Sequence, residues 1–202
     1  KSSERALSRG VNADYIFKTV KQFRQSDKQT PVILMGYLNP IERRGWAWYA
    51  EHCAAAGVDA LLIVDLPPEE AETVRATLNQ NGLQLISLLA PTTRGTRLKQ
   101  ACADAQGYLY YVSMAGVTGK GLEGASDLIG RVQEIQGLAD VPVFVGFGIK
   151  DVETATACAQ FADGVIIGSA LVSALTECKS PEQSRLAAFD FLRPIRQAMD
   201  LV

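Results

Sequence analysis

A repeated strand-and-helix module constrains the fold of this chain more than any other feature. In each copy a short apolar run is followed by a polar turn and then by an amphipathic helix that stops near glycine or asparagine. Continuous apolar runs are typical of strands that are buried on both faces, as in parallel sheets. The predicted strands are 31–36, 59–65, 83–90, 108–113, 141–145 and 164–167. The predicted helices are 2–9, 12–25, 45–56, 68–80, 94–105, 126–136, 151–160, 169–178 and one from Ser180 to Met199.

The last two strands indicate which parallel architecture this is. Each predicted strand ends near a glycine, Gly148 or Gly168, and Ser169 opens the helix after the second. Glycine lets the backbone approach an anion, and the free N–H groups at a helix start favour one. In an eight-stranded (β/α)8 barrel the loops after the last two strands commonly hold phosphate. Either glycine alone is equally consistent with an ordinary turn, but the pair favours a phosphate site.

The chain is therefore expected to be an α/β protein with the (β/α)8 TIM-barrel fold. Six of the eight strands can be identified, and the 202 residues open in a helix, so we expect the other two strands upstream of Lys1. Residues 1–202 are then a single barrel domain, incomplete at its N-terminus. The strands 31–36 and 164–167 would be left as open edges, and we expect the 202 residues alone to be unstable or inactive.

Composition excludes several classes of function. A net charge of −2 without a basic cluster argues against nucleic acid, and no apolar run is long enough to cross a membrane. The four cysteines show no CxxC spacing and His52 is the sole histidine, so we expect no metal site and a reducing, cytoplasmic location. Asp65 ends the apolar run 61–64, where a carboxylate needs donors or solvent, which favours a site. The stretch 116–124 has four glycines in nine residues and is expected to be a mobile loop.

Several motifs resemble, in order, the tryptophan synthase α chain. The resemblance covers the whole chain, and the combination of Val64-Asp-Leu-Pro67 with Ser113-x-x-Gly-Val-Thr-Gly119 is specific. The other matching motifs are Tyr37-Leu-Asn-Pro40, Ala90-Pro-Thr-Thr93, Gly146-Phe-Gly148 and Gly168-Ser-Ala170.

The resemblance implies a lyase that cleaves indole-3-glycerol phosphate to indole and glyceraldehyde 3-phosphate by a retro-aldol reaction in tryptophan biosynthesis. It implies no cofactor in this chain, because pyridoxal phosphate belongs to the partner β chain of an αββα assembly. The family's catalytic glutamate and aspartate lie upstream of Lys1, so no residue of this chain is assigned a catalytic role.

The resemblance also assigns residues to other roles. Thr118 belongs to a lid over the substrate, and Asn39 and Pro40 meet the β chain, although Asn-Pro is also a common turn. Met114 replaces a frequent arginine of the family. The predicted phosphate ligands are Gly119, Gly148, Gly168 and Ser169. The predicted indole pocket consists of Tyr37, Leu62, Asp65, Tyr110, Phe147 and Ile166, most of which could equally be barrel core.

Three alternatives stay open. A flavin-dependent oxidoreductase would hold the phosphate of FMN with the same glycines, and a sugar-phosphate isomerase or epimerase shares the phosphate site. A chain without its catalytic acid and base could also be a non-catalytic fragment that only activates the β chain.

Overall fold

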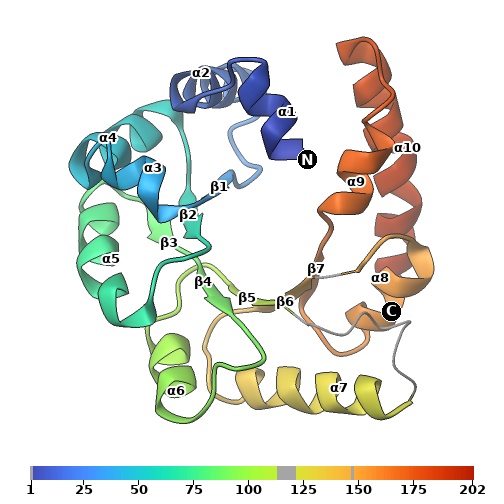
Figure 1. The fold of residues 1–202 in the computed structure, drawn as a ribbon. Coiled ribbons are helices and arrows are strands. Elements are labelled where there is room, and N and C mark those ends of the chain that lie inside the picture. Colours follow the sequence, from blue (N-terminus) through green and yellow to red (C-terminus); the bar gives the residue numbers. More distant parts are fainter. Residues whose placement is uncertain (1, 113–121, 147) are drawn as a thin grey trace. The chain divides into compact units, whose positions relative to one another are not determined.

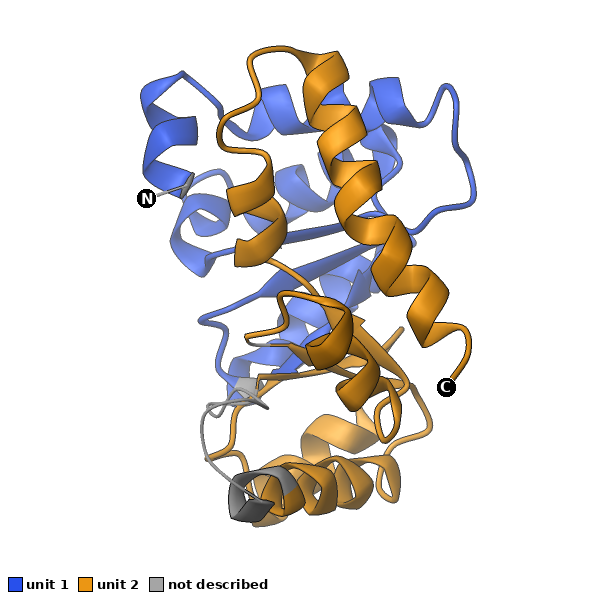
Figure 2. Ribbon diagram, turned by 90° about the vertical axis from the view of Figure 1, so that its right-hand side faces the viewer, with its two compact units in different colours: residues 1–88 blue, residues 89–202 orange. Residues whose placement is uncertain are grey.

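The computed structural model describes residues 2–112, 122–146 and 148–202, and shows an α/β protein with parallel strands (Figure 1). The described residues form two compact units, residues 1–88 and residues 89–202 (Figure 2). Helices and short strands alternate along both units, as the repeated module predicts. No helix among the described residues is long and apolar enough for a membrane span.

Unit 1 contains a three-stranded sheet in the order β1-β2-β3, with both neighbouring pairs parallel. Its edge strand β1 begins at Ile33, two residues after the predicted start, and β2 is also shorter than predicted. The elements of unit 1 are α1 (Ser2–Ser8), α2 (Ala13–Phe23), β1 (Ile33–Gly36), α3 (Leu38–Glu42), α4 (Trp46–Ala56), β2 (Ala60–Ile63), the 3-10 helix η1 (Pro68–Glu70), α5 (Ala71–Gln80) and β3 (Gln84–Leu85).

The core of unit 1 lies between its sheet and its helices. Leu61 and Ile63 of β2 share a buried cluster with Cys53 of α4 and Leu78 of α5. Successive strand residues point to opposite faces, so Leu62 lies on the other face of the sheet, where it is also buried. Helix α2 joins this core through Phe17 and Val20.

Unit 2 contains a four-stranded sheet in the order β4-β5-β6-β7, in which β6 pairs in parallel with both β5 and β7. Its core includes Leu109, Val143 and Val145 from the strands and Val132 and Cys158 from the helices. The elements are β4 (Ser87–Leu89), which crosses the unit boundary, α6 (Gly95–Ala103), β5 (Leu109–Val112), α7 (Leu122–Gln136), β6 (Val143–Gly146), α8 (Val152–Ala159), β7 (Gly164–Ile166), α9 (Ser169–Ala174) and α10 (Pro181–Met199).

The observed elements differ from the sequence expectations in two places. The run 83–90 is not one strand but two, because β3 ends at Leu85 and β4 begins at Ser87 in a different sheet. Thus the six predicted strands correspond to seven in the part of the chain that the structure describes. The segment with Asn39 and Pro40 forms the helix α3 rather than a simple turn, because proline is compatible with the first turn of a helix.

Candidate active site

The carboxyl ends of β6 and β7 bring two of the predicted phosphate ligands into neighbouring loops. The two strands are adjacent, and Gly146, the last residue of β6, pairs with Ile166, the last residue of β7. Gly148 and Gly168 each follow two residues later, so they lie in the loops rather than at the strand ends. Active sites of parallel α/β barrels form at this edge of the sheet.

Gly148 has a backbone conformation that requires glycine, with φ at +73°. The helix that follows, α8, begins with a capping box formed by Asp151 and Thr154. The carboxylate of Asp151 accepts the N–H of Thr154 at 2.9 Å, and the hydroxyl of Thr154 accepts the N–H of Lys150 at 3.1 Å. The start of α8 is therefore already occupied by groups of the chain itself.

Helix α9 begins differently. Ser169 is its first residue, as predicted, and the N-cap residue Gly168 has no side chain that could accept a hydrogen bond. The first N–H groups of a helix have no partner within the helix, and the helix dipole favours an anion beside them. A Cβ atom built at Gly168 would meet no atom within 4 Å. The start of α9 thus presents donors at the site edge and leaves space before them.

Tyr110 and Ile166, two predicted pocket residues, lie around Gly146. A Cβ atom on Gly146 would come within 2.5 Å of the Tyr110 hydroxyl oxygen, so this position accepts no side chain. Burial raises the pKa of Tyr110, which keeps its hydroxyl protonated and able to donate at neutral pH. Gly146 was not among the predicted site residues. The signal was available, since a glycine ending a buried strand often marks a close approach.

The predicted site residues of unit 1 form a second group. The Asp65 carboxylate accepts the backbone N–H of Leu38 at 2.7 Å, and Leu38 is the first residue of α3. Tyr37, the N-cap of α3, is 61% exposed and provides no side-chain cap. Asp65 thus takes the place of the missing cap. Leu62 is only 2% exposed and belongs to the packed sheet.

The remaining predicted site residues lie either on α3 or outside the described residues. Asn39 and Pro40 are exposed on α3, which fits a surface that meets a partner. Gly119, Thr118 and Phe147 lie outside the described residues.

The structure gives no sign of a metal site within its described residues, where no group of potential ligands clusters. His52 packs on the Trp48 ring with 3.8 Å between ring centroids, and its Nδ1 atom lies 2.8 Å from the Trp48 carbonyl oxygen. The cysteines are free thiols, and burial raises the pKa of Cys53 to about 12. These residues are structural.

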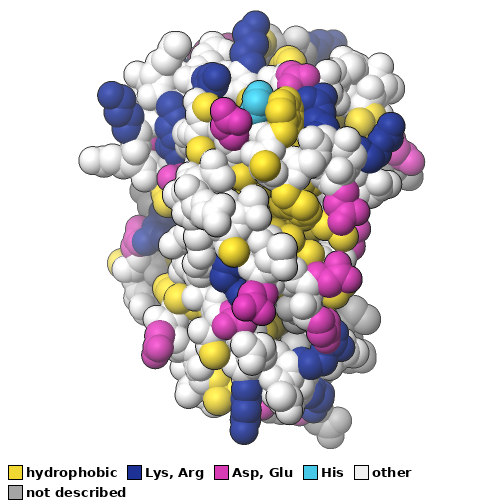
Figure 3. Space-filling view, turned by 90° about the vertical axis from the view of Figure 1, so that its left-hand side faces the viewer, with side chains coloured by type: hydrophobic (Ala, Val, Ile, Leu, Met, Phe, Trp, Pro, Cys, Tyr) yellow, Lys and Arg dark blue, Asp and Glu magenta, His cyan; other side chains and the backbone are white. Residues whose placement is uncertain are grey.

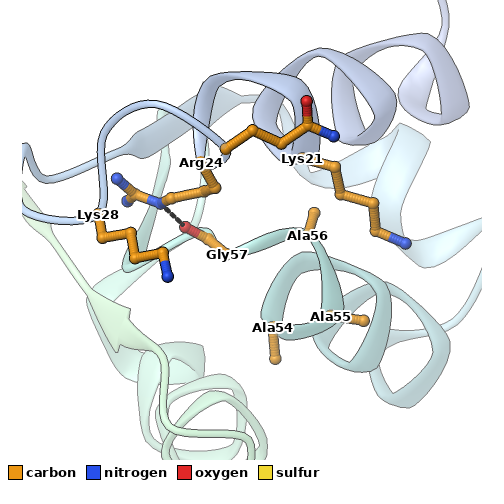
Figure 4. A pocket seen from close by; sticks show the side chains of 8 residues that line it. Lys21, Arg24, Lys28, Ala54, Ala55, Ala56 and Gly57 are labelled. Atoms are coloured by element: carbon orange, nitrogen blue, oxygen red, sulfur yellow. Dashed lines mark hydrogen bonds between the residues drawn. The ribbon is translucent and has the colours of Figure 1, made fainter.

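A pocket of about 660 Å³ lies near the opposite edge of the unit 1 sheet, where β2 begins (Figure 4). It is lined by Lys21, Arg24 and Lys28 and by the end of α4. The Arg24 guanidinium, however, donates to the Gly57 carbonyl at 2.7 Å and pairs with Asp59 at 2.5 Å. The amino-terminal edge of barrel strands serves stability rather than catalysis, so we assign this cluster to the fold.

Comparison with known proteins decides the family. The family model for the tryptophan synthase alpha chain matches residues 1–199. The chain belongs to the tryptophan synthase alpha chain family. A tryptophan synthase alpha chain of Xanthomonas campestris pv. campestris is 51% identical over 99% of this chain and 74% of its own length.

Solved structures of tryptophan synthase alpha chains have the same fold. The crystal structure of the tryptophan synthase alpha chain from Legionella pneumophila is 39% identical, with a TM-score of 0.86 over 98% of this chain and 74% of its own. A subunit of the tryptophan synthase a2b2 complex from Pyrococcus furiosus is 31% identical, with a TM-score of 0.83 over 96% of this chain and 77% of its own. The (β/α)8-barrel class is confirmed, and the flavin-dependent and isomerase alternatives are not favoured.

Proposed function

We propose that this tryptophan synthase alpha chain cleaves indole-3-glycerol phosphate to indole and glyceraldehyde 3-phosphate. The observation that carries the proposal is the pair of loops after β6 and β7, with a left-handed glycine in one and a helix start headed by glycine in the other. Such donors suit the phosphate that anchors a small substrate. Gly148, Gly168 and Ser169 would hold the phosphate, with Gly119 as a fourth ligand.

Cleavage of the carbon–carbon bond needs three kinds of help. The indole ring carbon must be protonated, the glycerol hydroxyl beside the breaking bond must lose its proton, and the charge that develops on the indole must be stabilised. In the family two carboxylates provide this help, and we assign no residue of this chain to that role. We assign neither role to Asp65, whose carboxylate already accepts the Leu38 N–H.

The residues of this chain would then position the substrate. Tyr110 would present its hydroxyl beside Gly146, and Ile166 and Phe147 would give the indole an apolar surface. Thr118 would act from the loop over the substrate. These positioning roles affect the rate because a small misplacement of a bound substrate is costly.

The assembly and the cell compartment belong to the same proposal. The Pyrococcus furiosus relative was solved as an a2b2 complex, and we propose that this chain likewise binds a β chain through the surface that includes Asn39 and Pro40. The chain itself would need no cofactor and would act in the cytoplasm, as part of one barrel domain.

The direct test is indole release from indole-3-glycerol phosphate. It should be measured with these 202 residues and with a protein extended at its N-terminus to the length of its relatives. We expect slow release by the extended protein and faster release after addition of the β chain. Absence of indole from both proteins, with and without the β chain, would contradict the proposal.

A further inference from the structure

A pocket of about 390 Å³ in unit 1 combines apolar walls with an acidic rim, and neither the proposed substrate site nor the fold accounts for it. Its walls include Leu38 of α3, Trp46 of α4 and Leu66 of the loop after β2. Glu42 and Glu70 line it and are exposed. No lysine, arginine or histidine is among the described residues that line it. Figure 3 shows hydrophobic side chains with acidic ones beside them on the face that carries α4 and α5.

Helix stability accounts for only one of these two glutamates. Glu70 is the N-cap residue of α5, where a carboxylate interacts favourably with the helix dipole. Glu42 is the last residue of α3, the end at which the dipole favours a cation instead. Its carboxylate is therefore placed against the preference of its own helix, and the helix does not account for it.

The pocket is continuous with the surface proposed to meet the β chain. Leu38 and Glu42, which line the pocket, are the first and last residues of the short helix that also contains Asn39 and Pro40. The hydrogen bond from the Leu38 N–H to Asp65 holds the start of that helix against the loop that supplies Leu66. The wall of the pocket and the predicted contact residues are thus parts of one element.

We propose that this pocket receives a lysine or arginine side chain of the β chain. Such a side chain lays an apolar stem along apolar walls while its charged head stays at the rim, which is the arrangement that this pocket offers. The head meets Glu42 and Glu70, and the stem packs on Leu38, Trp46 and Leu66. The inference rests on the proposed partnership with a β chain and names the chemistry of one contact within it.

The test is the dissociation constant for the tryptophan synthase β chain, measured by calorimetry at low and high salt. Removing both rim charges with Glu42→Gln and Glu70→Gln should weaken binding about tenfold and flatten its salt dependence, because both charge pairs with the incoming side chain are lost and salt then has less attraction to screen. The matched control is Glu72→Gln, an exposed glutamate in the first turn of α5 that does not line the pocket. It should bind like the parent protein.

A second readout separates this role from a structural one. Glu42→Gln alone should leave the fold unchanged or slightly more stable, since it removes an unfavourable helix-end charge, and yet it should weaken binding. Equal binding by the double variant and the Glu72→Gln control would overturn the inference and leave the partnership intact. A parent protein that does not bind the β chain would overturn both. Self-association of the double variant can be measured by sedimentation velocity. If self-association changes while binding of the β chain does not, the pocket belongs to an interface with a second copy of this chain and the proposal is overturned.

Discussion

Helices α3 and α9 both start just after a strand, and their first N–H groups are treated differently. In unit 1 the Asp65 carboxylate accepts the Leu38 N–H, so the start of α3 is satisfied by the chain itself. In unit 2 the start of α9 is preceded by Gly168, which offers no side-chain acceptor. The comparison teaches that the same local feature serves as a structural anchor in one unit and as a candidate anion site in the other.

The largest effect should come from making the start of α9 resemble that of α3. Gly168→Asp places a carboxylate at the N-cap, and its Cβ atom would meet no atom within 4 Å. Because that anion repels phosphate, affinity for glycerol 3-phosphate should fall about tenfold or more, while stability holds or rises by a few tenths of a kcal/mol. Calorimetric titration and thermal melting measure the two quantities.

A neutral substitution provides the control for this change. Gly168→Asn also caps the helix but carries no charge, so its loss of phosphate affinity should be smaller. Equal affinity in the aspartate variant and the parent would show that phosphate does not bind at the start of α9.

The converse change removes the anchor of α3. Asp65→Ala should lower the free energy of unfolding by about 1 kcal/mol, the usual cost of losing a helix cap. Denaturant unfolding measures this, and hydrogen exchange of the Leu38 amide should become faster. Asp65→Asn keeps an acceptor oxygen and should lose less. An unchanged exchange rate at Leu38 in the alanine variant would exclude the capping role.

A third effect, similar in size to that of Asp65→Ala, tests the loop after β6. Gly148→Ala places a side chain on a left-handed backbone, and we expect a loss of stability of about 1 kcal/mol. Gly130→Ala in α7 is the matched control, because that glycine is helical, exposed and has open space around it. It should stabilise the protein instead, by about 0.5 to 1 kcal/mol. Urea denaturation should show that the free energy of unfolding falls in Gly148→Ala and rises in Gly130→Ala. A Gly148→Ala variant that is more stable than the parent would refute the conformational argument.

The smallest effect concerns pH and the self-capped helix α8. The backbone N–H and hydroxyl of Thr154 lower the pKa of Asp151 below its ordinary value of 3.8. A lowered folded-state pKa contributes stability above pH 3.8 that is lost as the pH falls through the lower value. The Asp151→Asn variant should therefore lose stability less steeply than the parent as the pH falls below 3.8. If the melting temperatures of the parent and of Asp151→Asn depend on pH in the same way, Asp151 makes no such contribution.

The sequence predicted well what depends on neighbouring residues. Asn12 caps α2 and Ser180 caps α10, and these are the positions at which the predicted helices begin; Ser169 opens α9, as predicted. Successive strands are neighbours within each sheet, which is the order that the predicted barrel requires.

Other features depend on contacts across the fold, and the sequence could not supply them. In α2, Phe17 and Val20 are buried, whereas the equally apolar Ile16 and Phe23 are exposed. Which face of a helix is buried depends on the residues that pack against it, which for α2 include Trp48 and Tyr49 of α4. The partner of Asp65 is equally non-local, since Leu38 is far from it in sequence. Apolarity alone did not reveal the break in the run 83–90.

The most direct test of the phosphate site is a titration of the isotope-labelled protein with glycerol 3-phosphate, followed by nuclear magnetic resonance. We predict that the largest amide shifts occur at Gly168, Ser169 and Gly148, while the amide of Leu38, already bonded to Asp65, does not move. Shifts that gather at other amides while those of Gly168 and Ser169 stay unchanged would contradict a phosphate site at the start of α9.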